Sequence, residues 1–375
     1  MVSPELSSYA SRLSAVMVRR GSDFDFEAWA LELFRLQYAH NPAYARICRA
    51  QACVPESVRC ARDIPVVPTF AFKEWDMTSL PPEARTAVFH SSGTTVARPS
   101  RHHHWPASLA LYDLSARTWF LRHFPTATSS GGVTKRVWSL TPPPACVPTS
   151  SLVHMFAGVG CWMGATSTAF LGRLNEAGDW CLEIERWKEG IELANRDQQP
   201  VILLGTAFLF VHLLDALASM PGPFVLPEGS MVLETGGYKG RSRAIPREEL
   251  HRSLSRGLGV PLDRIVCEYG MSELSSQAYA ILELDSERSG VQEPSHSGLR
   301  RFRFPPWVRW AVISPETGRE IPDGMPGLLR VWDLANVWSV MGIQTEDVAT
   351  SMNGAFELHG RSPAASPRGC SLMAA

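Results

Sequence analysis

The sequence predicts an α/β fold whose largely parallel sheet is covered by helices. Between residues 135 and 267, short continuous apolar runs, typical of strands buried on both faces, alternate with segments of helical periodicity. Such alternation favours parallel strands joined by helical crossovers. The three most polar, glycine-rich loops of this region directly follow predicted strands, and parallel sheets bind ligands at the carboxyl ends of their strands. The pattern therefore predicts both the fold class and the edge of the sheet that carries a site.

The composition permits a large buried core and excludes several classes of protein. The chain has 375 residues, of which 45% are hydrophobic, and a formal net charge of -1. This balance gives no general reason to expect nucleic acid or an acidic membrane surface as a partner. No apolar run approaches the ~20 residues that span a bilayer. Eight cysteines without a C-x-x-C pair, and a start without a signal segment, predict reduced thiols in a cytoplasmic protein.

The first 85 residues are expected to form helices and extended segments. Apolar residues at helical spacing predict one helix over residues 3–20 and a second over residues 26–37. Asn41 followed by Pro42 is expected to stop the second helix. Residues 64–68, with the sequence IPVVP, are bounded by prolines and predict an extended segment.

The next 200 residues carry the strand and helix alternation. Strands are expected at residues 135–140, 201–204, 231–234 and 264–267, and helices at residues 107–124 and 247–258. Thr206 follows the second of these strands and is expected to cap the helix that begins there. After residue 286 the pattern changes, and residues 307–313 and 327–333, either side of a turn, predict antiparallel strands of a smaller β-rich subdomain.

A run of small hydroxyl residues, SSGTT at residues 91–95, predicts a phosphate-binding loop. A short apolar lead-in precedes it, and Gly93 lets backbone N–H groups approach an anion closely. The loop lacks the spacing of a P-loop, which excludes that class of kinase and GTPase. A solvated turn is the alternative for such a run taken alone. The groups that would hold the anion are the hydroxyls of Ser91, Ser92, Thr94 and Thr95 and the positive charges of Arg98, Arg101 and His102.

Three consecutive histidines, His102 to His104, follow the loop. Adjacent side chains point in different directions, and no Cys or His partner at zinc-site spacing accompanies them, so zinc is not expected here. His102 is the member expected to belong to the site, whereas His103 and His104 are expected at the surface.

Three further polar loops follow in the sequence. They are residues 235–240 (TGGYKG), residues 269–273 (YGMSE), and residues 345–347 (TED) with the later Gly360 and Arg361. In this order, the four loops resemble those of the adenylate-forming enzyme superfamily, which has a Ser/Thr/Gly phosphate loop, a Y-G-x-[ST]-E loop, a T-x-D ribose contact and a hinge arginine. Within that superfamily the chain resembles most the acyl-protein synthetase family, the LuxE-like fatty-acid activating component of bacterial bioluminescence. The resemblance covers almost the whole chain, and the stretches that carry it include residues 34–48 (FRLQYAHNPAYARIC), 64–76, 234–251, 268–279 and 360–372.

The resemblance implies an ATP-dependent reaction in two steps. A carboxylate attacks the α-phosphate of ATP to give an acyl-adenylate and pyrophosphate, and a thiol of the enzyme then takes the acyl group. The resemblance also implies the N-terminal large domain of the adenylate-forming fold, without the separate C-terminal domain that carries a catalytic lysine in most of the superfamily. The expected parts are an N-terminal helical and extended region (1–85), an α/β nucleotide- and acyl-binding core (86–285), a β-rich subdomain (286–360) and a mobile tail with Cys370 (361–375).

The same resemblance implies roles for individual residues. Glu273 would hold Mg²⁺, and Ser272 would contact the phosphate or the acyl carboxylate. The nucleotide contacts implied are Tyr269 at the adenine, Gly236 and Gly237 close to it, Lys239 at phosphate or carboxylate, Asp347 at the ribose hydroxyls, and Arg361 at ribose or phosphate. The alternatives from the residues alone are a helix cap for Glu273, a core aromatic for Tyr269, turn residues for the glycines and Asp347, and exposed charges for Lys239 and Arg361.

Cys370, in the sequence R-G-C, is the acyl acceptor that the resemblance implies. Arg368 would lower the pKa of its thiol, and Gly369 would permit a tight approach. The acid is expected to be a fatty or other carboxylic acid, and the final acceptor a partner protein such as an acyl reductase. Two alternatives stay open: an adenylating ligase that delivers the acyl group to a carrier protein, coenzyme A or an amine, and a catalytically idle binding subunit.

Overall fold

The computed structural model describes seven stretches of the chain, which contain two large sheets. These stretches are residues 1–19, 24–91, 98–124, 135–165, 168–238, 242–280 and 300–362. Six strands form the first sheet, in the order β11-β10-β9-β8-β4-β5, and the second sheet runs β1-β14-β13-β12 with β15 beside β14. The predicted α/β class with an additional β-rich part is confirmed.

The six-stranded sheet is largely parallel, as predicted. Its strands are β4 (Arg136–Ser139), β5 (Ala169–Phe170), β8 (Val201–Thr206), β9 (Met231–Thr235), β10 (Ile265–Tyr269) and β11 (Ala278–Ala280). Only β11 runs antiparallel to its neighbour, β10. All residues of β8 and β9 are buried, which explains why residues 201–204 and 231–233 are continuously apolar rather than alternating.

Helices cover both faces of this sheet. The helices of the region are α5 (Pro106–His123), α6 (Ser151–Trp162), α7 (Ile184–Arg196), α8 (Ala207–Ala218) and α9 (Arg247–Leu258). Because side chains alternate along a strand, Val201 and Leu203 pack with α7, α8 and α9, whereas Ile202 and Leu204 pack with α5 and α6. The small pair β6 (Gly172–Leu174) and β7 (Trp180–Leu182) lies between β5 and α7 in the chain.

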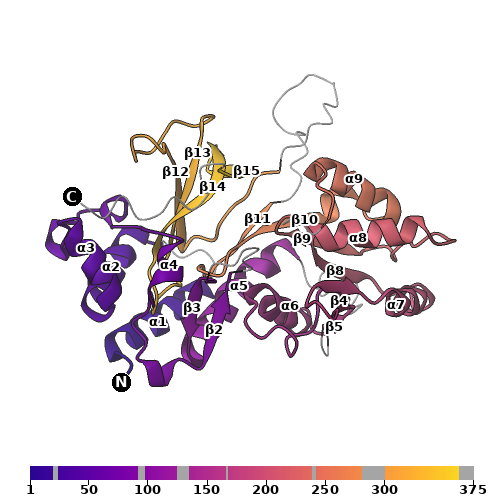
Figure 1. Cartoon of the computed structure of the whole chain (residues 1–375), viewed down its shortest axis with the longest axis horizontal. Coiled ribbons are helices and arrows are strands. Elements are labelled where there is room, and N and C mark those ends of the chain that lie inside the picture. The colour runs from indigo at the N-terminus through magenta and orange to yellow at the C-terminus, as the bar shows by residue number, and fades with distance from the viewer. Residues whose placement is uncertain are drawn as a thin grey trace.

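The N-terminal region packs on the β-rich sheet. It contains α1 (Pro4–Met17), α2 (Phe26–His40), α3 (Pro42–Ala50), β1 (Val67–Pro68), α4 (Ala71–Glu74) and the hairpin β2 (Ala87–His90) and β3 (Arg101–His104). The strands of the β-rich part are β12 (Val308–Ile313), β13 (Pro326–Asp333), β14 (Gly342–Met352) and β15 (Ala355–Arg361). Strand β1 pairs in parallel with β14, and one hydrophobic core joins these two regions. Figure 1 shows them on one side of the molecule and the six-stranded sheet on the other.

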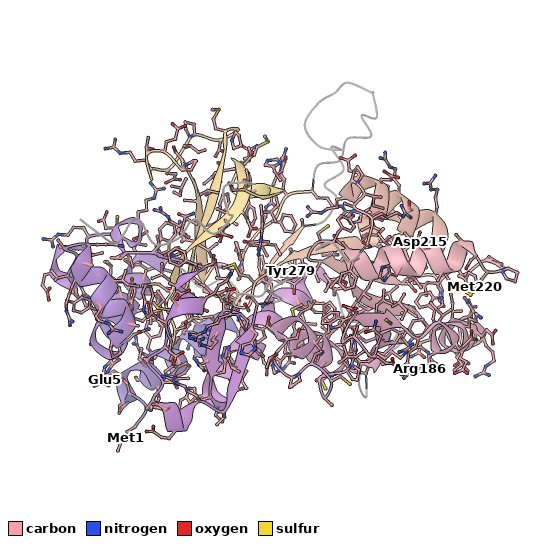
Figure 2. All side chains as sticks on the ribbon, viewed as in Figure 1. Met1, Glu5, Arg186, Asp215, Met220 and Tyr279 are labelled. Atoms are coloured by element: carbon pink, nitrogen blue, oxygen red, sulfur yellow. The ribbon has the colours of Figure 1, made fainter. Side chains whose placement is uncertain are left out.

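Side chains fill the junction between these parts. Tyr279, on β11, lies near the middle of the molecule and packs in the core that α5 and α6 cover (Figure 2). Figure 2 places Arg186, Asp215 and Met220 at the far end from Met1 and Glu5. None of the helices in the described stretches has both the length and the apolar character needed to cross a membrane.

Two local predictions need correction. Residues 42–50 form the helix α3, which the sequence analysis did not anticipate, because Asn41 and Pro42 start this helix as well as ending α2. Asn41 accepts a hydrogen bond of 3.1 Å from the backbone N–H of Tyr44. Thr206 occupies the position before α8, but its side chain makes no capping bond, and its hydroxyl has no partner among the described residues. Thr206 pairs with Thr235 as the last residue of β8, so it belongs to the strand and not to the helix.

Candidate active site

Two of the predicted loops begin at neighbouring strand ends. Strand β9 ends at Thr235, followed by Gly236 and Gly237, and β10 pairs with it in parallel, with Glu268 opposite Thr235. The loops after both strands therefore leave the same edge of the sheet. Gly236 has a φ of 65°, which favours glycine. Among the residues that the structure describes, a Cβ added at Gly236 or Gly237 would meet no atom within 4 Å, so the backbone here is open to a ligand.

Tyr269, Asp347 and Arg361 come together at this edge. The Tyr269 hydroxyl donates a hydrogen bond of 2.8 Å to Oδ2 of Asp347, and Nε of Arg361 lies 3.7 Å from Oδ1. Asp347 and Arg361 face each other across β14 and β15. Burial raises the pKa of the Asp347 carboxyl, while the bond from Tyr269 opposes that rise. The β-rich sheet thus brings an acceptor and a cation to the end of β10.

Ser272 and Glu273 lie buried in the turn that follows β10. The Ser272 hydroxyl donates a hydrogen bond of 2.9 Å to Oε2 of Glu273. The hydroxyl of Ser100 lies 3.3 Å from that of Ser272, so the end of the first loop contacts the third. Residues 270–277, all of which the structure describes, form turns and no helix, so Glu273 is not the cap of a following helix.

His102 contacts the backbone of this turn. Its Nδ1 lies 2.9 Å from the backbone carbonyl oxygen of Ser272. Because a carbonyl only accepts, Nδ1 carries the proton and donates. Burial lowers the pKa of His102 to about 4, so the ring is neutral near pH 7. His102 therefore holds the Ser272 backbone and carries no charge toward a phosphate.

The phosphate loop is described only at its ends. The backbone N–H of Ser100 donates to the Ser91 hydroxyl at 3.1 Å, which joins the two ends of the loop. Ser92, Gly93, Thr94 and Thr95 lie outside the described residues, as do Lys239 and Cys370. Arg101 is paired, since its Nε lies 3.2 Å from Oδ1 of Asp76.

The surface position expected for His104 is wrong. The alternation of β3 turns His102 and His104 inward, with 4% and 1% exposure. His103 faces the other way and lies partly buried, where its Nε2 is 3.2 Å from Oδ1 of Asp76. Burial lowers the pKa of His104 well below its ordinary value. The three histidines therefore pack inside the protein or pair with Asp76, and none of them is a freely exposed surface residue.

Two buried residues that the sequence analysis missed hold the Ser272–Glu273 turn. Asp333, at the end of β13, accepts hydrogen bonds from the Ser275 backbone at 3.0 Å and from the Ser276 hydroxyl at 2.8 Å. The Asn336 amide donates to the backbone carbonyl of Glu273 at 2.9 Å. Burial raises the pKa of Asp333 to about 6, against these hydrogen bonds. A carboxylate as the last residue of the predicted strand at 327–333 was the available signal.

Glu268 is a third residue that the sequence analysis missed, and it directly precedes Tyr269. Its side chain is buried and accepts a hydrogen bond from the Thr235 hydroxyl. Burial raises the pKa of this carboxyl to about 7, while the Thr235 bond opposes the rise. The edge of the sheet thus combines a titrating carboxyl with the open backbone at Gly236.

Solved structures of 2-hydroxyisobutyryl-CoA ligase have a similar fold. One, an open conformation in complex with 2-HIB-AMP and CoA, has 14% sequence identity and a TM-score of 0.62, and the match covers 88% of this chain and 74% of that chain. A second, in the postadenylation state with R3-HIB-AMP, has 12% identity and a TM-score of 0.63 over 88% of this chain and 67% of that chain. A third, in the thioesterification state, has 13% identity and a TM-score of 0.61 over 95% and 68%. At these identities the likeness shows the fold alone, which is that of adenylate-forming enzymes.

A family comparison covers the part of the chain that contains most of the site. No curated protein matches the sequence. The family model described as "Acyl-protein synthetase, LuxE" matches residues 180–374, more than half of the chain. Gly236, Tyr269, Glu273, Asp347 and Arg361 all lie within the match. The chain therefore belongs to the LuxE acyl-protein synthetase family and is an AMP-forming ligase of the acyl-adenylate type.

Proposed function

We propose that this enzyme activates a fatty acid with ATP and then transfers the acyl group to its own Cys370. The observation that carries the proposal is the meeting of two groups at one sheet edge. Tyr269 with Asp347 forms one group, and Ser272 with Glu273 forms the other, only three residues further on. An adenylating enzyme needs a nucleotide contact and a phosphate contact this close together.

The nucleotide would lie against the ends of β9 and β10. The Tyr269 ring would line the adenine, and the open backbone at Gly236 and Gly237 would admit it closely. Asp347, whose side chain is 20% exposed, would accept hydrogen bonds from the ribose hydroxyls. Arg361, with a side chain 78% exposed, is free to turn from Asp347 toward ribose or phosphate.

The phosphates would lie beside Glu273. Its carboxylate and the hydroxyls of Ser272 and Ser100 are oxygen donors, which are the donors that suit Mg²⁺. A bound Mg²⁺ would neutralise charge on the phosphate oxygens during transfer. The hydroxyls and backbone of residues 91–95 would complete the phosphate contacts, with Arg101 near the end of that loop. His102 would fix the Ser272 carbonyl and so hold Glu273 in place.

The chemistry consists of two displacements. The substrate carboxylate attacks the α-phosphorus of ATP, and pyrophosphate leaves, which forms the acyl-adenylate. The Cys370 thiolate then attacks the acyl carbonyl carbon, and AMP leaves, which forms a thioester. We propose an acyl reductase or another acyl-accepting protein as the next acceptor. Within the described ranges seven cysteines are free thiols, in support of the cytoplasmic location that the sequence predicts.

Acid-dependent exchange of pyrophosphate into ATP tests the first step. We expect exchange with fatty acids from a panel of chain lengths, and a loss of at least about 100-fold in Glu273→Gln, because one carboxylate stabilises the bound cation and phosphates. Glu249→Gln, an exposed position on α9, is the matched control and should keep full activity. Exchange that depends on no acid of the panel, or that survives in Glu273→Gln, would contradict the proposal.

A further inference from the structure

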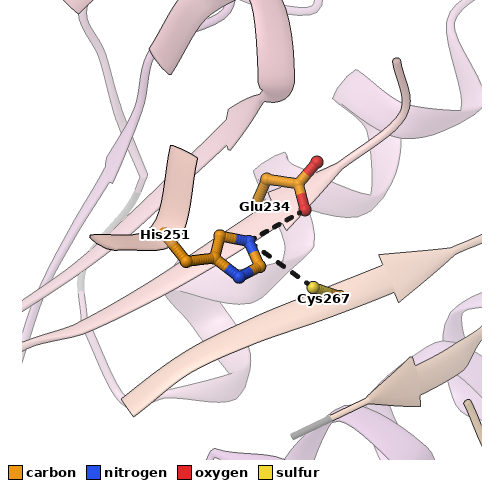
Figure 3. Close-up of side chains that lie close together, drawn as sticks. All are labelled: Glu234, His251 and Cys267. Carbon is orange, nitrogen blue, oxygen red and sulfur yellow. Dashed lines mark hydrogen bonds and ion pairs between the residues drawn. The ribbon is translucent and has the colours of Figure 1, made fainter. Parts of the chain in front are cut away.

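Glu234, His251 and Cys267 form a buried cluster behind the site. Glu234 lies on β9 and Cys267 directly opposite on β10, whereas His251 reaches them from α9 (Figure 3). The three residues are 1–2% exposed. None of them has a part in the adenylation site proposed above.

The three donor atoms lie close together. Nε2 of His251 lies 3.4 Å from Oε2 of Glu234 and 3.7 Å from Sγ of Cys267, and all three ligand atoms lie within 4.8 Å of one another. In a catalytic triad, the histidine bonds the nucleophile through one ring nitrogen and the acid through the other. Here both partners face the same nitrogen, which is the arrangement of ligands around a shared ion (Figure 3).

The separation between His251 and Glu234 fits a tetrahedral metal site better than a direct hydrogen bond, and the separation between His251 and Cys267 fits both. A good N–H···O bond has a length of about 2.9 Å, shorter than the 3.4 Å between His251 and Glu234. Around zinc, bond lengths of about 2.0–2.1 Å to nitrogen and oxygen and about 2.3 Å to sulfur, at tetrahedral angles, give edges of about 3.3 Å and about 3.6 Å. The 3.4 Å and 3.7 Å separations match these two edges.

We propose that Glu234, His251 and Cys267 bind a zinc ion, with a fourth position left for a further ligand. Imidazole, thiolate and carboxylate are all zinc ligands, and a thiolate disfavours Mg²⁺ and Ca²⁺. A carboxylate and a thiolate together balance the charge of a divalent ion. Two arginines lie near the cluster. Nε of Arg247 is 3.9 Å from Oε2 of Glu234, and its partly exposed side chain can turn to solvent. Arg300 also acts on His251 and Cys267, but its guanidinium donates to the backbone carbonyls of Ile265 and Leu262.

The ion would hold together the elements that carry the nucleotide loops. Glu234 directly precedes Thr235 and the two glycines, and Cys267 lies two residues before Tyr269. A zinc ion would cross-link β9, β10 and α9 just behind the sheet edge. Its expected effect is therefore on the stability and geometry of that edge.

Metal analysis of the full chain tests the site without acid or ATP, so its outcome is independent of the proposed reaction. We expect the purified chain to retain about one zinc ion per molecule and to show a higher Tm after Zn²⁺ is added than after chelation. With Co²⁺ in place of zinc, a thiolate-to-cobalt charge-transfer band should appear. The band should vanish in Cys267→Ser and stay in Cys48→Ser, whose cysteine is equally buried but outside the cluster.

Two results would contradict the proposed zinc site. In the first, the wild-type chain holds no more zinc than Cys267→Ser, and its Tm does not respond to Zn²⁺. In the second, the cobalt charge-transfer band persists in Cys267→Ser. If the variants fail to fold, the zinc content and the Zn²⁺-dependent Tm of the wild-type chain decide the question alone.

Discussion

The hydroxyl of Tyr269 lies 2.8 Å from a carboxylate oxygen of Asp347, across a sequence separation of 78 residues. This bond joins the last residue of β10 to the middle of β14, and so joins the two sheets. Arg361 approaches the other oxygen of the same carboxylate. The relationship makes Asp347 the centre of the nucleotide contact that we propose.

Asp347→Asn should weaken ATP binding. The amide offers only one acceptor oxygen and no charge, and hydrogen bonds to charged groups contribute about 1.5–3 kcal/mol, so we expect the KM for ATP to rise about 10- to 100-fold. Tyr269→Phe keeps the ring and removes only the hydroxyl, so its KM should rise less than about 10-fold. Both are measured by pyrophosphate exchange at saturating acid. An unchanged KM in Asp347→Asn would remove this residue from the nucleotide site.

Alanine at Gly236 and at Gly237 should have different effects. Gly236→Ala places a Cβ at a φ of 65°, which costs about 1 kcal/mol of stability in a left-handed conformation. Gly237→Ala meets no described atom and should leave the free energy of unfolding unchanged. If adenine lies against this backbone, Gly237→Ala should nevertheless raise the KM for ATP. Denaturant unfolding and exchange kinetics measure the two effects, and a Gly237→Ala variant with normal KM would place the adenine elsewhere.

Asp333→Asn should destabilise the Ser272–Glu273 turn. Asp333 is fully buried and accepts hydrogen bonds from Ser275 and Ser276, and an amide group turned toward these donors leaves them unpaired. We expect a loss of about 2–4 kcal/mol in the free energy of unfolding, together with lower exchange activity. Asp215→Asn breaks an exposed ion pair with Arg243 and is the control, with an expected loss below about 1 kcal/mol. Equal losses in both variants would argue against this role.

Glu268 should make stability fall as the pH rises. Burial raises its pKa from 4.5 to about 7, so between these values the folded chain binds more protons than the unfolded chain. Its contribution to stability is therefore fully present below pH 4.5 and is lost as the pH rises through about 7. Glu268→Gln removes this titration, so its stability relative to wild type should increase by up to about 3 kcal/mol across that window. Urea unfolding at a series of pH values measures the difference, and parallel pH profiles would show that Glu268 does not titrate there.

Local patterns predicted the elements of the sheet well. Residues 201–204, 231–234 and 265–267 lie in strands, one residue short of the predicted start at 264, and α9 has the predicted bounds. Burial on both faces and helical periodicity can be recognised from neighbouring residues, which is why these elements could be predicted. The helix α3 was missed because one Asn-Pro signal both ends a helix and starts the next.

Long-range register accounts for what the sequence did not reveal. Three identical histidines give no sign of which ones a strand turns inward, so the burial of His104 required the β2–β3 pairing. Glu234 and Cys267 meet only through the register of β9 and β10, and His251 only through the docking of α9. Asp333 accepts a hydrogen bond from Ser275, next to the Ser272–Glu273 turn and 58 residues away in the sequence. No local sequence pattern can predict a contact at that separation.

The second step of the proposed reaction rests on Cys370, which needs a direct chemical test. The chain is incubated with ATP, Mg²⁺ and a panel of carboxylic acids, and its intact mass is measured for wild type, Cys370→Ser and the exposed-cysteine control Cys146→Ser. We predict a hydroxylamine-labile acyl adduct on wild type and on Cys146→Ser, with none on Cys370→Ser. The same adduct on Cys370→Ser, or acid-dependent AMP release from wild type without any adduct, would contradict transfer to Cys370.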